Sequence, residues 1–182
     1  MLNTPNILSL LRLCMVPVYV IVYFSRLEYA RVLAAVVYAL ATLTDVLDGH
    51  IARKHNLITN LGKVLDPLGD KMLTVAVLAS LAIDEIIPGW IVLIVVGKEA
   101  MMGIGGLVIH RRAKVEIPPS NYIGKSATAL FFVICVILMV FDPGKTASVI
   151  LISFAVFVSL VAFAHYLRNF IGIMKTSKEI KE

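Results

Sequence analysis

Four aspartates, arranged in two pairs, are the residues whose type and spacing could do chemistry. Asp45 and Asp48 are three residues apart, and Asp66 and Asp70 are four apart. Residues at either spacing lie on one face of an α-helix, so each pair would present two carboxylates together. Oxygen ligands without Cys or His favour hard divalent cations. The pattern therefore predicts a site for Mg²⁺ or Mn²⁺, with a pair of ions expected.

The surroundings of these carboxylates strengthen the metal interpretation. They lie at the ends of two apolar segments, and a charge inside a membrane costs about 2.5–3.5 kcal/mol on insertion scales. Neighbouring carboxylates also repel one another, so a cation must compensate them. The alternative is that they only cap helices and pair with Arg53, Lys63 and Lys71. That alternative suits one or two aspartates better than all four.

Small and basic residues follow the first aspartate pair. If the preceding helix continues through this region, Gly49, Ala52 and Arg53 share the carboxylate-bearing stripe at four-residue spacing. His50 lies about 100° away from Gly49 around such a helix, and it is the alternative candidate for a base. Pro67 suits the first position of a helix and Asp66 the N-cap before it, so we expect the next helix to begin there.

The composition places these residues in a membrane protein. The 182-residue chain is 59% hydrophobic, far above the average of soluble domains. Uniformly apolar runs of about 20 residues are long enough to cross a bilayer as helices, and they lack the alternation of barrel strands. The expected spans are Leu8–Phe24, Ala30–Leu47, Pro67–Ile83, Gly89–Ile109, Gly124–Phe141 and Ala147–Met174. We predict an all-α integral membrane protein with six transmembrane helices in a single domain, residues 1–182.

The basic residues predict the orientation of these helices. Of the 17 Lys and Arg residues, three lie on the side away from the termini, namely Arg26, Arg31 and Lys145, and Lys98 lies inside the fourth span. The others lie on the side of the termini, where the positive-inside rule places the cytoplasm. We therefore expect a multi-pass cell-membrane protein with cytoplasmic N and C termini and a cytoplasm-facing site. The net charge of +5 reflects this orientation, and no nucleic-acid partner is expected.

The motif D-x2-D-G-x2-A-R-x8-G-x3-D-x3-D, from Asp45 to Asp70, resembles the signature of the CDP-alcohol phosphotransferase family. The six-helix plan is also similar to that family. The resemblance implies that all four aspartates ligate metal and that Asp70 is also the catalytic general base. It implies a homodimer embedded among membrane lipids. It also assigns CDP-diacylglycerol binding to residues of the motif and the first helix: Gly49, Ala52, Arg53, Thr59, Gly62, Ser9 and Arg12.

The N-terminal pattern Asn6-x2-Ser9-x2-Arg12 resembles Asn-x2-Thr-x2-Arg in the family's phosphatidylglycerophosphate synthases. That resemblance implies transfer of the phosphatidyl group from CDP-diacylglycerol to glycerol 3-phosphate, giving phosphatidylglycerophosphate and CMP. Basic side chains could bind the phosphate of this acceptor. The candidates are Arg111, Arg112, Lys125 and Lys98. Simple anchoring of the first three at the membrane surface is the alternative.

Further residues bear on the acceptor. Lys98 and Glu99 form an intramembrane pair, which is either a site or a brace between helices. His165, Tyr166 and Arg168 are candidates for the acceptor pocket, and anchoring of Tyr166 and Arg168 at the membrane surface is the alternative. Family members that use glycerol 3-phosphate commonly have Arg-Glu where this chain has Lys-Glu, so a cardiolipin synthase using phosphatidylglycerol is the alternative. A divalent-cation transporter is a weaker alternative, because the carboxylates cluster at one end of two helices.

Overall fold

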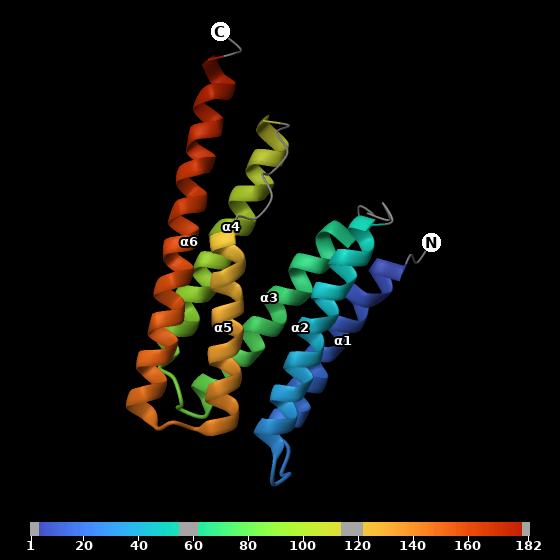
Figure 1. The fold of residues 1–182 in the computed structure, drawn as a ribbon, viewed down its shortest axis with the longest axis vertical. Coiled ribbons are helices and arrows are strands. Elements are labelled where there is room, and N and C mark those ends of the chain that lie inside the picture. Colours follow the sequence, from blue (N-terminus) through green and yellow to red (C-terminus); the bar gives the residue numbers. More distant parts are fainter. Residues whose placement is uncertain (1–3, 55–61, 114–121, 180–182) are drawn as a thin grey trace.

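The computed structural model describes the backbone of residues 4–54, 62–113 and 122–179, with side chains in 10–44, 68–103 and 122–168. Regular structure in these ranges is entirely helical, which confirms the all-α class (Figure 1). The helices are α1 (Thr4–Tyr23), α2 (Ala30–Lys54), α3 (Gly62–Ile83), α4 (Gly89–Ala113), α5 (Tyr122–Phe141) and α6 (Lys145–Glu179). Their order matches the six apolar runs of the sequence.

The start of α3 differs from the prediction. The helix begins at Gly62, so Asp66 lies inside it and is not its N-cap. Pro67 is the sixth residue of α3 and removes one backbone hydrogen bond, to the carbonyl of Lys63. The first four N–H groups of any helix have no partner within it. The turn before Asp66 therefore does not depend on a hydrogen bond from Pro67, and it forms although the proline follows closely. At the other side of the motif, α2 continues to Lys54, as the shared stripe requires.

The helices form two groups. In one group α1, α2 and α3 contact one another, and in the other α6 contacts α4 and α5. Contacts of α3 with α4 and α5, and of α2 with α5, join the groups. Figure 1 shows both termini at one end of the molecule, here called the terminal end. The short connections 24–29, 84–88 and 142–144 lie at the opposite end, the loop end.

The surface of the bundle is strongly apolar. Ile21, Leu93, Phe141 and Phe157 are each more than 60% exposed. Within the described residues, Tyr122–Phe141 and Lys145–Arg168 are long and apolar enough to cross a membrane, and Leu10–Tyr23 and Ala30–Thr44 are shorter apolar helices. Such an outside suits contact with hydrocarbon better than with water.

A cluster of charges joins the three connections at the loop end. Arg31 contacts Asp84 Oδ2 through Nη2 at 2.9 Å and Asp142 Oδ2 through Nη1 at 3.3 Å. The hydroxyl of Tyr23 donates to the same Asp84 oxygen at 3.1 Å. Asp142 has a φ of 39°, a left-handed conformation that closes the turn between α5 and α6. We call Tyr23, Arg31, Asp84 and Asp142 the loop-end cluster.

Candidate active-site cavity

A cavity of about 430 Å³ lies between the two groups of helices. Five helices form its wall, α2 to α6, so residues distant in sequence meet there. The wall residues with polar side chains are Tyr38, Thr42, Asp70, Lys71, Thr74, Lys98, Glu99, Thr128, Ser159, His165 and Tyr166. A volume of this size suits a small molecule or the head group of a lipid.

Asp70 is the motif aspartate whose side chain the structure describes. It lies on α3, is exposed, and forms part of the cavity wall. Asp66 precedes it by one turn on the same continuous helix, which confirms the backbone spacing expected for the second pair. Asp45 and Asp48 lie on α2, which contacts α3. The predicted base therefore faces a space that a substrate can enter.

Other predicted site residues lie outside the described part. Thr59 belongs to an undescribed segment. Side chains are not described for Ser9, Asp45, Asp48, Gly49, His50, Ala52, Arg53, Gly62, Asp66, Arg111 and Arg112. The helices α2 and α3 carry the four aspartates and contact each other. The four aspartates offer carboxylate oxygens as ligands. This donor set fits a hard cation such as Mg²⁺ or Mn²⁺ and does not fit a metal that prefers Cys or His.

An ionic cluster occupies the wall beside Asp70. Glu99 Oε1 lies 2.8 Å from Lys98 Nζ, and Glu99 Oε2 lies 3.6 Å from Lys71 Nζ. Lys71 also donates to the backbone carbonyl of Glu99 at 3.2 Å. Lys98 donates to Ser159 Oγ at 2.6 Å. The cluster thus connects α3, α4 and α6, and we call Lys71, Lys98, Glu99 and Ser159 the cavity cluster.

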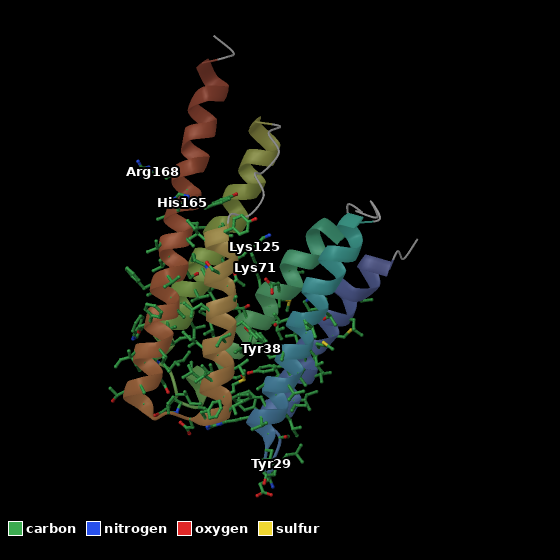
Figure 2. The ribbon with its side chains drawn as sticks, viewed as in Figure 1. Tyr29, Tyr38, Lys71, Lys125, His165 and Arg168 are labelled. Atoms are coloured by element: carbon green, nitrogen blue, oxygen red, sulfur yellow. The ribbon has the colours of Figure 1, made fainter. Side chains whose placement is uncertain are left out.

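The predicted acceptor residues divide into two sets. Lys98, His165 and Tyr166 lie in the cavity wall, whereas Lys125 and Arg168 are exposed and, among the described residues, are not part of the wall. Figure 2 shows Lys71, Lys125 and His165 at a similar height on α3, α5 and α6, with Tyr38 nearer the loop end. Arg12 is 1% exposed on α1, a helix that contributes no described residue to the wall.

The sequence did not identify a charged, two aromatic and a hydroxyl-bearing residue of the wall. Lys71 follows Asp70 directly and looked like a partner for the aspartates at the membrane surface, but its ammonium contacts Glu99 on α4. Tyr38 and Phe132 lie within apolar spans, where no sequence signal separates a cavity wall from ordinary packing. Their rings pack with centroids 5.0 Å apart. Thr74 was also missed, and its hydroxyl donates to the Asp70 carbonyl at 3.0 Å.

The fold and the site define an apolar helical bundle with two carboxylates and two ammonium groups around an internal cavity, where the ammonium groups can bind an anionic substrate at a membrane. Residues 2–161 match the family model described as CDP-alcohol phosphatidyltransferase. The chain belongs to this family.

The relatives described below carry the names of two kinds of enzyme. The chain is 32% identical over 140 residues to the CDP-diacylglycerol–glycerol-3-phosphate 3-phosphatidyltransferase of Bacillus subtilis, covering 70% of this chain and 72% of that protein. It is 31% identical over 187 residues to the "Probable phosphatidylglycerophosphate synthase" of Mycobacterium tuberculosis, covering 96% and 87%. It is 37% identical over 131 residues to the "Cardiolipin synthase (CMP-forming)" of Streptomyces coelicolor, covering 70% and 60%.

Proposed function

We propose that this protein transfers the phosphatidyl group of CDP-diacylglycerol to glycerol 3-phosphate, forming phosphatidylglycerophosphate and CMP. The relatives from B. subtilis and M. tuberculosis support this acceptor. The observation that carries the proposal is the cavity in which Asp70 lies beside the paired ammonium groups of Lys71 and Lys98. A base next to cations is what transfer to a hydroxyl on a phosphorylated alcohol needs.

Asp70 has the central role in the proposed reaction. Its carboxylate takes the proton of an acceptor hydroxyl, and the oxygen attacks the phosphorus that bears the diacylglycerol. The new P–O bond forms as the bond to the CMP phosphate oxygen breaks, and CMP leaves. Because Asp70 is exposed to the cavity, an acceptor can reach it without rearrangement of α3. Proton transfer by a positioned carboxylate contributes about 10²–10⁴-fold.

The nucleotide half of the site is assigned to the motif. Asp45, Asp48, Asp66 and Asp70 would hold a pair of Mg²⁺ or Mn²⁺ ions. The bound ions would neutralise the pyrophosphate and stabilise CMP as a leaving group. The remaining residues of this half are proposed to bind CDP-diacylglycerol: Gly49, Ala52, Arg53, Thr59, Gly62, Ser9 and Arg12.

The acceptor half is assigned to basic residues near the terminal end. Lys98 lies in the wall with a side chain only 13% exposed, so its charge acts in a poorly solvated environment. Arg111, Arg112 and Lys125 are proposed to guide the acceptor phosphate toward the cavity. All three belong to the side that the positive-inside rule assigns to the cytoplasm.

The proposed setting is a cell membrane crossed by all six helices, with the terminal end in the cytoplasm. The apolar exterior and the common location of both termini support this arrangement. The loop end would then face the opposite side. We also propose a homodimer, to be tested by light scattering of the detergent-solubilised protein.

The test is an acceptor panel. The full chain is purified in detergent with CDP-diacylglycerol and Mg²⁺, and CMP release is measured with glycerol 3-phosphate, phosphatidylglycerol, other alcohols and no acceptor. We expect release with glycerol 3-phosphate. Release with phosphatidylglycerol alone would establish the second candidate, a cardiolipin synthase, which the S. coelicolor relative favours. No release with any alcohol would refute the enzyme assignment.

A further inference from the structure

Glu99 occupies a central position in the cavity cluster. Its two carboxylate oxygens contact different lysines, Lys98 from its own helix and Lys71 from α3. The side chains of Glu99, Lys98 and Lys71 are 22%, 13% and 31% exposed, so solvent screens these charges only partly. Partial burial of three charges is costly, and a brace between helices could be made more cheaply from apolar residues.

Each lysine is held by one further contact. Ser159 on α6 accepts from Lys98, and the Glu99 carbonyl accepts from Lys71. Gly103, one turn along α4 from Glu99, lies against the second ammonium, since a Cβ added there would be 3.4 Å from Lys71 Nζ. An ammonium group has three N–H donors. Lys98 uses two of them, for Glu99 Oε1 and Ser159 Oγ, and Lys71 uses one, for the Glu99 carbonyl, because its 3.6 Å contact with Glu99 Oε2 is an ion pair too long for a hydrogen bond. Within the described residues, each lysine therefore keeps a donor for a ligand in the cavity.

The charges around the cavity explain why a glutamate is needed. The described wall carries Lys71 and Lys98 against Asp70 and Glu99, together with His165 and Tyr166. Two ammonium groups facing one cavity repel each other, and long lysine side chains would move apart unless an anion held them. Because one carboxylate contacts both, the two ammonium groups stay within reach of a single phosphate.

We propose that Glu99 is a positioning residue that holds Lys71 and Lys98 as a two-point clamp for the phosphomonoester of a short polyol phosphate. The proposal rests on the proposed function. It deepens that function because Lys71 directly follows Asp70, the proposed base, and both residues line the cavity. A phosphate on the clamp leaves the hydroxyl end of a three-carbon acceptor close to the base. Glu99 acts through the lysines and does not touch the reacting atoms.

The test uses Glu99→Gln in the full chain, which keeps the shape of the side chain and removes its charge. We expect the KM for glycerol 3-phosphate to rise about tenfold, as loss of a charge-assisted contact predicts, while the KM for CDP-diacylglycerol stays within about twofold. Glu99→Asp should recover part of the loss. Glu85→Gln is the matched control, because the Glu85 side chain is 83% exposed at the loop end and solvent screens its 3.6 Å ion pair with Lys145.

A double-variant cycle separates positioning from bracing. If Glu99 acts through Lys98, Glu99→Gln should add little to the rise in acceptor KM already caused by Lys98→Met. A brace predicts instead that Glu99→Gln lowers the melting temperature and weakens both substrates alike. Either that result or an unchanged acceptor KM would overturn the proposal.

Binding without turnover keeps this inference separate from the proposed function. Calorimetry measures glycerol 3-phosphate binding to the wild type, Glu99→Gln and Glu85→Gln without CDP-diacylglycerol. Binding that weakens only in Glu99→Gln supports the clamp even if the wild type releases no CMP, which would refute the proposed function alone. Equal binding by all three proteins, or none by the wild type, refutes the clamp even where CMP is released.

Discussion

The two ends of this bundle use charged residues in opposite ways. In the loop-end cluster one guanidinium is balanced by two carboxylates, and the Arg31 and Asp142 side chains are 37% and 62% exposed. In the cavity cluster two ammonium groups share one carboxylate, and Lys98 is only 13% exposed. The first arrangement joins three connections at low desolvation cost. The second cluster has two ammonium groups to one carboxylate, which suits an anionic ligand, and the carboxylate of Asp70 lies in the same wall.

The backbone differs between the same two regions. At the loop end, Glu85 and Asp142 adopt left-handed conformations with φ of 56° and 39°, so tight turns fix the spacing of the helices. Around the cavity, the wall residues come from five continuous helices. The loop end therefore fixes the frame, and side chains of the helices determine the chemistry. Substitutions at the loop end should therefore change stability, and substitutions around the cavity should change turnover.

Removal of divalent metal should have the largest effect, confined to the cavity side. EDTA is expected to abolish CMP release, because the four carboxylates would lose the cations that neutralise them and the pyrophosphate. Mg²⁺ or Mn²⁺ should restore release. Melting should also shift upward when Mg²⁺ is added, since a ligand of the folded state stabilises it. Full turnover after exhaustive chelation would refute the metal assignment.

Asp70→Asn should have the second-largest effect. We expect kcat to fall about 10²–10⁴-fold, because the amide cannot take the proton from the hydroxyl of glycerol 3-phosphate. The measurement is CMP release at saturating glycerol 3-phosphate, with the melting temperature recorded in parallel. Asp142→Asn is the matched control at the loop end, and its turnover should stay near that of the wild type. An Asp70→Asn variant with full turnover would transfer the base role elsewhere, with His50 as the first alternative.

The sequence predicted the helices well because each is built on a long, uniformly apolar run. Ala30 and Gly89 begin helices as expected, while α2 and α6 extend beyond the apolar runs to Lys54 and Glu179. The start of α3 was wrong because Pro67 was assumed to lie at the first helical position. Pro67 removes one backbone hydrogen bond of the helix. The four residues before Asp66 can still form a helical turn, so α3 starts earlier than predicted.

The site was predicted less evenly. Spacing marked Asp70 as a candidate metal ligand, and the family resemblance implied its role as a base. The structure adds that Asp70 lies in the cavity wall. Glu99 was noticed because charges inside an apolar span are costly. Its link to Lys71 could not be inferred, since it depends on how α3 packs against α4. Contacts between helices follow from side-chain packing, which no motif records.

Loss of Arg31 should affect stability and leave chemistry intact. Arg31→Ala removes contacts with Asp84 and Asp142, and we expect unfolding to be easier by about 1–2 kcal/mol, since these groups are partly exposed. Thermal unfolding in detergent is the measurement. Arg31→Lys should lose less because one ammonium can still contact a carboxylate. A large fall in kcat at a temperature where the variant is folded would show that the two ends are coupled.

The smallest perturbation is a pair of cysteine substitutions that reports which end faces the cytoplasm. Tyr29, labelled at the loop end in Figure 2, is 64% exposed. Tyr122, the first residue of α5, is 91% exposed. Tyr29→Cys and Tyr122→Cys are made with Cys14 and Cys135 replaced by Ala, and turnover should change little. In intact cells a membrane-impermeant maleimide should label position 29 only, and lysis should expose position 122. The reverse pattern would place the cavity on the outer side, away from cytoplasmic glycerol 3-phosphate, so this labelling also tests the proposed acceptor.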